Sequence, residues 1–255
     1  VLPEYRRLKE RYDFLQMARN PELSTEVTLM AFKYLDVDAA IIFSDIMIPF
    51  DGLGIDYTIE KGVGPIVAEP VRSLEQVKAF RPFHPEEQVG YLLEGLRMVR
   101  RELKGERALL GFAGAPFTLA CYLIEGRPSR DFARAKQLMY SEPDVWHGLM
   151  DALTSVQVTY LRAQIDAGAD AVQLFDSWVG GLGPDDYREY VFPYMQRLFS
   201  RLQETGVPTI HFGTGTATLL DQMAAAGGDV IGLDWRVPID EGWERVGFDR
   251  AVQGN

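Results

Sequence analysis

The chain has 255 residues, 47% of them hydrophobic, and a formal net charge of -11 at pH 7. This length and apolar content suffice for a large core and predict one or two domains. The negative charge argues against nonspecific binding to nucleic acid or anionic membranes, and no apolar run approaches the roughly 18 residues that cross a bilayer. The single cysteine, Cys121, excludes an internal disulfide framework, so we expect a cytoplasmic protein.

The first predicted strand is the apolar run 39–43, which leads through Ser44 into the carboxylate Asp45. A run rich in Ile and Phe predicts a strand that is buried on both faces. An aspartate at the carboxyl end of such a strand, followed by the apolar residues 46–50, is costly unless a cation or hydrogen-bond donor faces it. Asp45 is therefore a candidate active-site residue. The alternative is that it only accepts hydrogen bonds from turn amides.

Strands and helices alternate along the rest of the chain. After a surface excursion expected at 52–70, a helix is predicted from Pro85, with an apolar face that includes Leu92 and Leu96. Further helices are predicted from Pro143 to Gly168, from Pro184 with a kink or break at Pro193, and around 217–226. The remaining predicted strands are 108–113, 171–175, 208–212, 230–233 and 251–253.

Six strands separated by helices predict a parallel sheet with right-handed crossovers. A (β/α)8 TIM-type barrel usually takes about 250 residues. We therefore expect residues 1–255 to form a single (β/α)8 barrel domain that lacks its first and last strands, and we expect the chain to be incomplete at both ends.

Polar residues follow the carboxyl ends of the predicted strands, where a barrel places its active site. We expect these residues to face one mouth: Asp45, Gly114 to Pro116 with Tyr122 shortly after, Asp176 and Ser177, His211 with Gly213 to Gly215, and Asp234 with Trp235.

Six segments of the chain form a more specific pattern. They are LPEYR at 2–6, FSDI at 43–46, GAPFTL at 114–119 with Tyr122 and Glu125-Gly126 after it, QLFDS at 173–177, GLDW at 232–235 and QGN at 253–255. The order and spacing resemble those of the uroporphyrinogen decarboxylase family, over essentially the whole chain.

The resemblance implies a (β/α)8 barrel enzyme of haem biosynthesis. It would remove the carboxyl groups from the four acetate side chains of uroporphyrinogen III, giving coproporphyrinogen III, with neither a metal nor an organic cofactor. We also expect a homodimer, although the sequence itself does not fix the oligomeric state.

The resemblance also assigns candidate site residues. Asp45 matches the family's essential aspartate, which binds the pyrrole N–H groups at the centre of the macrocycle. Tyr122 and Ser177 match its substrate-contacting tyrosine and serine, and Phe112 matches an aromatic residue that packs on the macrocycle. Lys9 aligns with a basic residue near the mouth. The family's arginine segment before Leu2-Pro3 and its histidine on the last strand have no counterpart in the chain, so the proton donor is not identified.

Each supporting residue also has an ordinary structural interpretation. Tyr122 and Phe112 suit a hydrophobic core, and Ser177 suits a helix cap. The loop from Arg127 to Arg130, where Arg127-Pro128 stands in place of the family's glycine-rich stretch, suits a solvated turn, with a basic lid as the alternative.

Two other functions remain open at this point. A corrinoid-linked methyltransferase on the same barrel would need zinc held by soft ligands, but His211 and the single Cys121 lie far apart in the sequence. A tetrapyrrole-binding protein without turnover would bind porphyrinogen and release no carbon dioxide. A decarboxylase needs only one buried carboxylate to stabilise a cationic pyrrole.

Overall fold

A computed structural model describes residues 2–254, which contain a parallel sheet and a separate antiparallel hairpin. The order of the parallel strands, β1-β4-β5-β6-β7-β8, follows the chain. Their bounds are β1 (Ala39–Ile41), β4 (Ala108–Gly114), β5 (Ala171–Asp176), β6 (Thr209–Gly213), β7 (Val230–Gly232) and β8 (Ala251–Gln253). All six predicted strands are confirmed, and no observed strand end differs from the predicted one by more than two residues.

The helices are α1 (Pro3–Lys9), α2 (Phe14–Ala18), α3 (Pro21–Leu35), α4 (Pro49–Leu53), α5 (Leu74–Lys78), α6 (Pro85–Gln88), α7 (Gly90–Leu103), α8 (Pro116–Glu125), α9 (Ala133–Ser141), α10 (Pro143–Asp166), α11 (Pro184–Tyr190), α12 (Phe192–Gln203), α13 (Leu220–Ala226) and α14 (Ile239–Val246), with a 3-10 turn η1 (Val179–Gly181). No helix among residues 2–254 is both long enough and apolar enough to cross a membrane.

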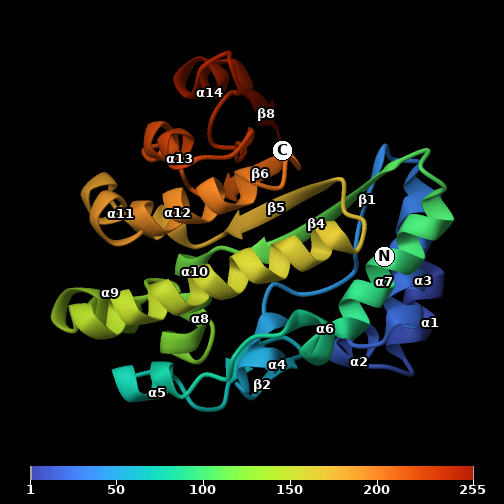
Figure 1. Cartoon of the computed structure of the whole chain (residues 1–255), viewed down its shortest axis with the longest axis horizontal. Coiled ribbons are helices and arrows are strands. Elements are labelled where there is room, and N and C mark those ends of the chain that lie inside the picture. Colours follow the sequence, from blue (N-terminus) through green and yellow to red (C-terminus); the bar gives the residue numbers. More distant parts are fainter. Residues whose placement is uncertain (1, 255) are drawn as a thin grey trace.

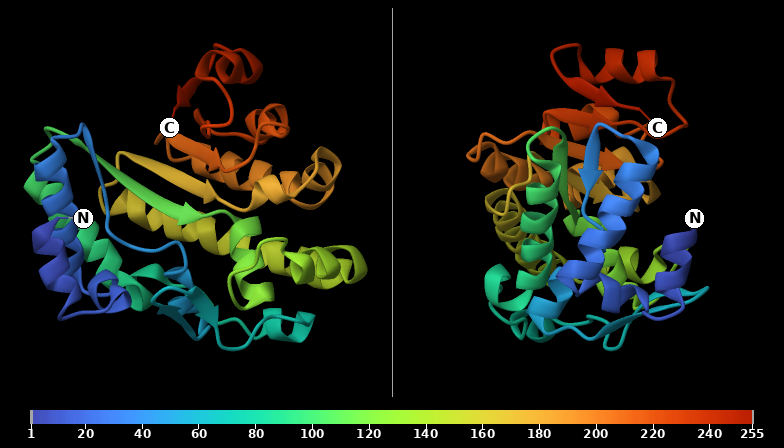
Figure 2. Two further views of the ribbon diagram at one scale, coloured as in Figure 1. Left: turned by 180° about the vertical axis from the view of Figure 1, so that it is seen from behind. Right: turned by 90° about the vertical axis from the view of Figure 1, so that its right-hand side faces the viewer.

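The sheet is curled, and one face of it is covered by helices. The long helix α10 lies across β4 and β5, while α7 packs on β4 and α12 on β6 (Figure 1). Seen from behind, the strands themselves face the viewer, and α3 stands beside β1 (Figure 2). Residues 2–254 thus form a half-barrel with edges at β1 and β8, which do not pair with each other. The described part of the chain does not close into a complete eight-stranded barrel.

Prolines set several of the predicted helix boundaries. Pro143 and Pro184 each occupy the first turn of a helix, where the missing N–H costs no hydrogen bond. The break expected at Pro193 is confirmed, because α11 ends at Tyr190 and α12 begins at Phe192. Gly168 follows α10 with a φ of 113°, a conformation that favours glycine.

The surface excursion expected at 52–70 includes an ordered hairpin. Strands β2 (Tyr57–Glu60) and β3 (Gly64–Val67) pair antiparallel, with Tyr57 opposite Val67. The hairpin is tied to the end of α8, because the Val67 N–H donates to the Gly126 carbonyl over 2.9 Å. This packing brings the hairpin beside the carboxyl end of the parallel sheet.

Candidate active site

Asp45 lies four residues beyond β1, in the turn that leads to α4. One carboxylate oxygen, Oδ1, accepts a hydrogen bond from the Met47 N–H over 2.8 Å, so the turn-amide interpretation holds for that oxygen. Burial raises the pKa of the Asp45 carboxyl, and the Met47 hydrogen bond lowers it in part. Within residues 2–254, the Asp45 carboxylate accepts no other hydrogen bond, which leaves its second oxygen for a ligand.

Three tyrosines lie close enough to this carboxyl group for its charge to affect their pKa values. Burial raises the pKa of Tyr122 to about 12, and the nearby charge of Asp45 adds to the effect. Burial is also the main cause of the raised pKa values of Tyr57 and Tyr160, and Asp45 contributes to both. All three phenols therefore stay protonated at neutral pH. Tyr122 was among the predicted site residues, whereas Tyr57 and Tyr160 were not.

The segment that follows Asp45 is anchored by an ion pair. The Arg19 guanidinium donates two hydrogen bonds to the Asp51 carboxylate, at 2.9 and 2.6 Å. The Tyr91 hydroxyl donates to the same carboxylate over 2.5 Å. Because Asp51 belongs to α4, these contacts fix the helix that begins directly after the Asp45 turn.

A row of aromatic rings crosses the uncovered face of the sheet. Phe112 on β4 packs edge-to-face on Phe175 of β5, with ring centroids 5.7 Å apart, and Phe175 packs likewise on Phe212 of β6 at 5.9 Å. Phe112 and Phe175 also line an apolar cavity of about 400 Å³ that reaches Ser44. Phe112 was predicted from the sequence, whereas Phe175 and Phe212 were missed. The pattern that could have identified them is the two-residue period of a strand, which puts residues 173 and 175 on the same face of the sheet.

The backbone of Phe112 is held by a buried glutamine. Gln164 of α10 accepts from the Phe112 N–H over 2.9 Å and donates to its carbonyl over 2.8 Å. Gly111 makes room for this side chain, since a Cβ at that position would lie 2.6 Å from the Gln164 amide oxygen. The first ring of the aromatic row is thereby fixed.

Ser177 follows β5 and is half-buried, next to Trp178. The Trp178 ring packs on Tyr122 with centroids 5.9 Å apart and on Phe132 at 5.3 Å. The structure thus places Ser177 beside the residue that contacts Tyr122. Trp178 itself was noted in the sequence only as a neighbour of Ser177.

Asp176 does not face the mouth, contrary to the expectation for strand-end residues. Its side chain is fully buried, and Oδ1 accepts from the Thr118 hydroxyl over 2.8 Å. The same Thr118 oxygen accepts from the Trp178 N–H over 3.2 Å. Burial raises the pKa of Asp176 to about 7, and the Thr118 contact lowers it in part. The period of two explains this placement: Phe175 faces the uncovered side, so Asp176 faces the helices.

Lys9 ends α1 on the surface, and its ammonium group lies 5.2 Å from the centre of the Tyr5 ring. Tyr5 in turn packs on Phe43, two residues before Asp45, with centroids 5.9 Å apart. The structure therefore brings the helix of Lys9 next to the Asp45 segment, although it shows no direct contact between these two side chains.

His211 was expected at a strand end and is instead in the middle of β6, fully buried. Its ring packs on Phe199, and burial lowers its pKa to about 4. Asp234 accepts hydrogen bonds from the Gly215 N–H and from Arg236, which outweigh burial and lower its pKa. Within residues 2–254, no three His, Cys, Asp or Glu side chains gather closely enough to hold a metal ion.

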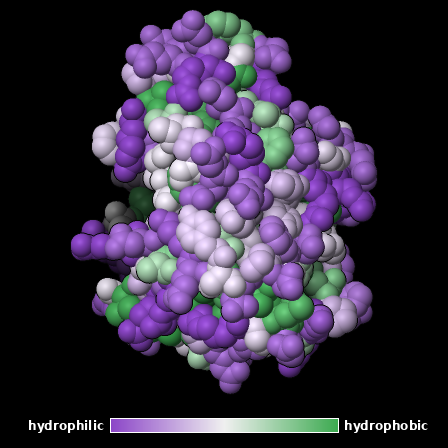
Figure 3. Space-filling model, turned by 90° about the vertical axis from the view of Figure 1, so that its left-hand side faces the viewer, coloured by the Kyte–Doolittle hydropathy of each residue, from purple (hydrophilic) through white to green (hydrophobic). Residues whose placement is uncertain are grey.

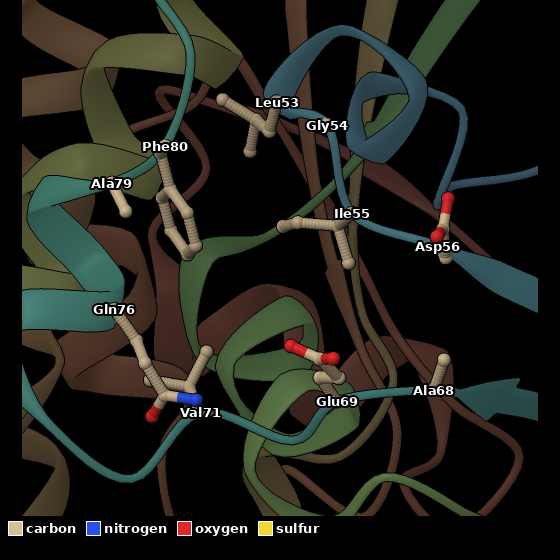
Figure 4. Close-up of a pocket in the computed structure, with 10 residues that line it drawn as sticks. All are labelled: Leu53, Gly54, Ile55, Asp56, Ala68, Glu69, Val71, Gln76, Ala79 and Phe80. Carbon is tan, nitrogen blue, oxygen red and sulfur yellow. The ribbon is translucent and has the colours of Figure 1, made fainter.

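A second cavity, of about 260 Å³, lies between α4, α5 and the two segments that flank the hairpin (Figure 4). Leu53, Ile55 and Phe80 give it apolar walls, and Asp56 and Glu69 contribute carboxylates. None of the predicted site residues lines it.

The face of the molecule shown in Figure 3 is mainly hydrophilic and is hollowed at its left margin.

Comparison with known proteins shows the family of this chain. Residues 1–255 match the sequence profile of the uroporphyrinogen decarboxylase (URO-D) family. The chain belongs to the uroporphyrinogen decarboxylase family. It is 51% identical to the uroporphyrinogen decarboxylase of Carboxydothermus hydrogenoformans over 254 residues, which cover 100% of this chain and 73% of that protein. The Thermus thermophilus enzyme is 53% identical over 252 residues, which cover 98% and 73% of the two chains.

A solved structure shares the fold of this chain. A methyltransferase from Methanosarcina mazei superimposes with a TM-score of 0.80 over 94% of this chain and 71% of that one, at 19% sequence identity. At this identity the likeness concerns the fold alone. The sequence-based recognition of the uroporphyrinogen decarboxylase family is confirmed, and its assignment of site residues stays a prediction.

Proposed function

We propose that this chain removes the carboxyl groups of the four acetate side chains of uroporphyrinogen III and yields coproporphyrinogen III. Its membership of the uroporphyrinogen decarboxylase family supports a carboxy-lyase of tetrapyrrole biosynthesis. The structural observation that carries the proposal is Asp45, a mostly buried carboxyl group with one oxygen left for a ligand, at the carboxyl end of a barrel-type sheet.

The chemistry requires a stabilised cation. A proton adds to a pyrrole α-carbon, which makes the ring cationic. The bond between the acetate methylene and its carboxylate then breaks, its electron pair neutralises the ring, and carbon dioxide leaves. A second proton adds to the methylene carbon as the ring returns its extra proton, which leaves a methyl group.

In this scheme Asp45 acts as an anion that faces the cationic ring and the pyrrole N–H groups. A fixed charge placed where positive charge develops lowers the barrier without reorganisation. At about 4 Å and an effective dielectric of about 20, a pair of unit charges is worth roughly 4 kcal/mol, or about three orders of magnitude in rate.

The other predicted residues have binding roles in the proposal. Phe112, with Phe175 and Phe212 beside it, offers an apolar surface for a macrocycle face. Tyr122 and Ser177 supply hydroxyl groups to the substrate, and Lys9 supplies a cation at the rim. An eight-carboxylate substrate on an acidic protein needs such local cations.

The test is anaerobic incubation of the protein with uroporphyrinogen III, followed by counting of the carboxyl groups on the products and of the carbon dioxide released. We expect four equivalents of carbon dioxide and the four-carboxylate product. Binding without release of carbon dioxide would instead identify a tetrapyrrole-binding protein.

The alternative of a corrinoid-linked zinc methyltransferase is not favoured. The described residues offer no cluster of ligands for the metal, and the similarity to a methyltransferase extends to the fold alone. We propose that turnover needs neither metal nor organic cofactor. Elemental analysis of active protein checks this, because a full equivalent of zinc whose removal abolishes turnover would overturn it.

We further propose that residues 1–255 belong to one catalytic domain of the (β/α)8 type, that the protein works in the cytoplasm, and that it forms a homodimer. These proposals rest on the family resemblance. Sedimentation equilibrium tests the last of them, and a mass of one chain at micromolar concentration would contradict it.

A further inference from the structure

We propose that Arg127 binds one peripheral carboxylate of the tetrapyrrole, in a small cavity beside the active site. This inference rests on the proposed function and adds to it a residue that the family resemblance does not assign. The cavity has a volume of about 170 Å³ and is lined by Tyr122, Arg127, Phe132 and Trp178 together with the turn of the β2–β3 hairpin.

The position of the cavity connects it to the site. Tyr122, a candidate substrate residue, lines it and packs on Trp178 with ring centroids 5.9 Å apart. Trp178, which follows the candidate substrate residue Ser177, lines it as well. A macrocycle that contacts Tyr122 and Ser177 would therefore have one edge beside this cavity.

The size of the cavity excludes the ring itself. Pockets that enclose drug-sized ligands measure roughly 300–1,000 Å³, so a volume of about 170 Å³ fits a short side chain rather than a tetrapyrrole. The acetate and propionate groups of the substrate are side chains of this kind, and each ends in a carboxylate.

The charge in the cavity matches such a group. Arg127 carries the only formal charge among the residues that line it, and within residues 2–254 its guanidinium forms no ion pair or hydrogen bond. The closest carboxylate in sequence, Glu125, is buried and accepts hydrogen bonds from the Arg134 and Ala135 N–H groups at the start of α9. An arginine fork without a partner is well suited to a carboxylate.

The loop that carries Arg127 is fixed on both sides. The Gly126 carbonyl accepts from the Val67 N–H of the hairpin over 2.9 Å. Pro128 packs against the hairpin turn so closely that a Cβ at Gly64 would lie 3.2 Å from its ring. The Ser129 hydroxyl then accepts from the Phe132 N–H over 3.1 Å. A fixed backbone reduces the entropy that is lost when the arginine binds a ligand.

The experiment compares Arg127→Gln with Arg130→Gln, a matched control in the same loop that does not line the cavity. We expect Arg127→Gln to raise KM for uroporphyrinogen III by about 5- to 30-fold, as is typical for loss of one charge-assisted hydrogen bond, with kcat within about twofold. Arg130→Gln should leave both unchanged, and Arg127→Lys should restore part of the affinity. Thermal unfolding of each variant checks the fold.

Inhibition by coproporphyrinogen III, which keeps the propionates and lacks the acetates, shows which of these two kinds of carboxylate Arg127 binds. A Ki that rises with the KM of Arg127→Gln assigns a propionate to the cavity, and an unchanged Ki assigns an acetate. Equal kinetics for Arg127→Gln and wild type, equal losses in Arg127→Gln and Arg130→Gln, or a loss confined to kcat would each overturn the inference. If wild-type protein releases no carbon dioxide, the proposed function fails instead.

Discussion

Two aspartates that follow or end strands of the same sheet, Asp45 after β1 and Asp176 at the end of β5, have different surroundings. Asp45 lies in a turn, shares one oxygen with the Met47 N–H and stands among tyrosines. Asp176 is the last residue of its strand, is fully buried, and bonds to Thr118 on the helix side of the sheet. Burial raises the pKa of both carboxyl groups.

The difference shows that a strand-end carboxylate is placed by the phase of its strand and by the turn after it. Asp176 is in phase with the buried Leu174 and so faces the helices, where Tyr187 of α11 is also close to it. Asp45 lies beyond the strand, so the two-residue period of β1 does not fix its direction, and its Oδ1 accepts from the Met47 N–H of the turn that follows. We therefore propose that Asp45 is the catalytic carboxylate and that Asp176 has a structural role.

The largest expected effect comes from Asp45→Asn. This change keeps the size and one acceptor oxygen but removes the charge, so kcat should fall by about three orders of magnitude. Asp45→Glu keeps the charge on a longer arm and should retain more activity. Asp176→Asn is the matched control, and turnover at saturating substrate should fall far less in it. Equal losses at the two positions would remove the distinction between them.

The second prediction concerns pH and Asp176. Its pKa is about 7 in the folded protein, against an ordinary value of 3.8, so the folded state holds more protons between these values. The protonated Asp176 carboxyl group contributes its full stabilisation to the folded state below about pH 4. This contribution falls by about 1.4 kcal/mol per pH unit as pH rises from there to the folded pKa of about 7, and it is lost above that pH. Tm measured from pH 4.5 to 8 should fall more steeply in wild type than in Asp176→Asn. Parallel curves would contradict the assignment.

A smaller effect is expected from Thr118→Val, which keeps the shape of the side chain and removes the hydroxyl group that links Asp176 to the Trp178 N–H. Loss of these buried hydrogen bonds should cost about 1–3 kcal/mol in urea unfolding. Thr159→Val, on the exposed side of α10, is the control and should change stability little. A cost no larger than that of the control would show that this link adds nothing.

The smallest effect should follow from Lys9→Gln. Lys9 is exposed and screened by water, so the KM for uroporphyrinogen III should rise less than about threefold. The rise should be smaller at high salt, which screens exposed charges. Lys104→Gln, an exposed change at the end of α7, provides the comparison. A rise above tenfold would place Lys9 in direct contact with the substrate.

Much of the fold was predictable because its signals are local. Apolar runs gave the strands, and Pro184 and Pro193 gave a helix break. Helix α8, which carries Tyr122, was not predicted, because it is buried on nearly every side and shows no polar face to mark a helical period. The N-terminal helices, α14 and the β2–β3 hairpin were not assigned either.

The site was less predictable than the fold. Asp45, Tyr122, Ser177, Phe112 and Lys9 came from a resemblance to a family, and their roles remain predictions. The cavity around Arg127 depends on the packing of the hairpin against the loop after α8, which no local pattern specifies. The orientation of Asp176 was accessible from the strand period, once Phe175 was assigned to the uncovered face.

The central claim is that Asp45 stabilises the charged intermediate more than the bound substrate. The most direct test measures kcat and the Ki of coproporphyrinogen III for wild type and Asp45→Asn in the same preparation. We predict that kcat falls by about three orders of magnitude while Ki rises by less than about tenfold, because the amide oxygen still accepts from pyrrole N–H groups. A near-normal kcat, or a Ki that rises as much as kcat falls, would contradict this account.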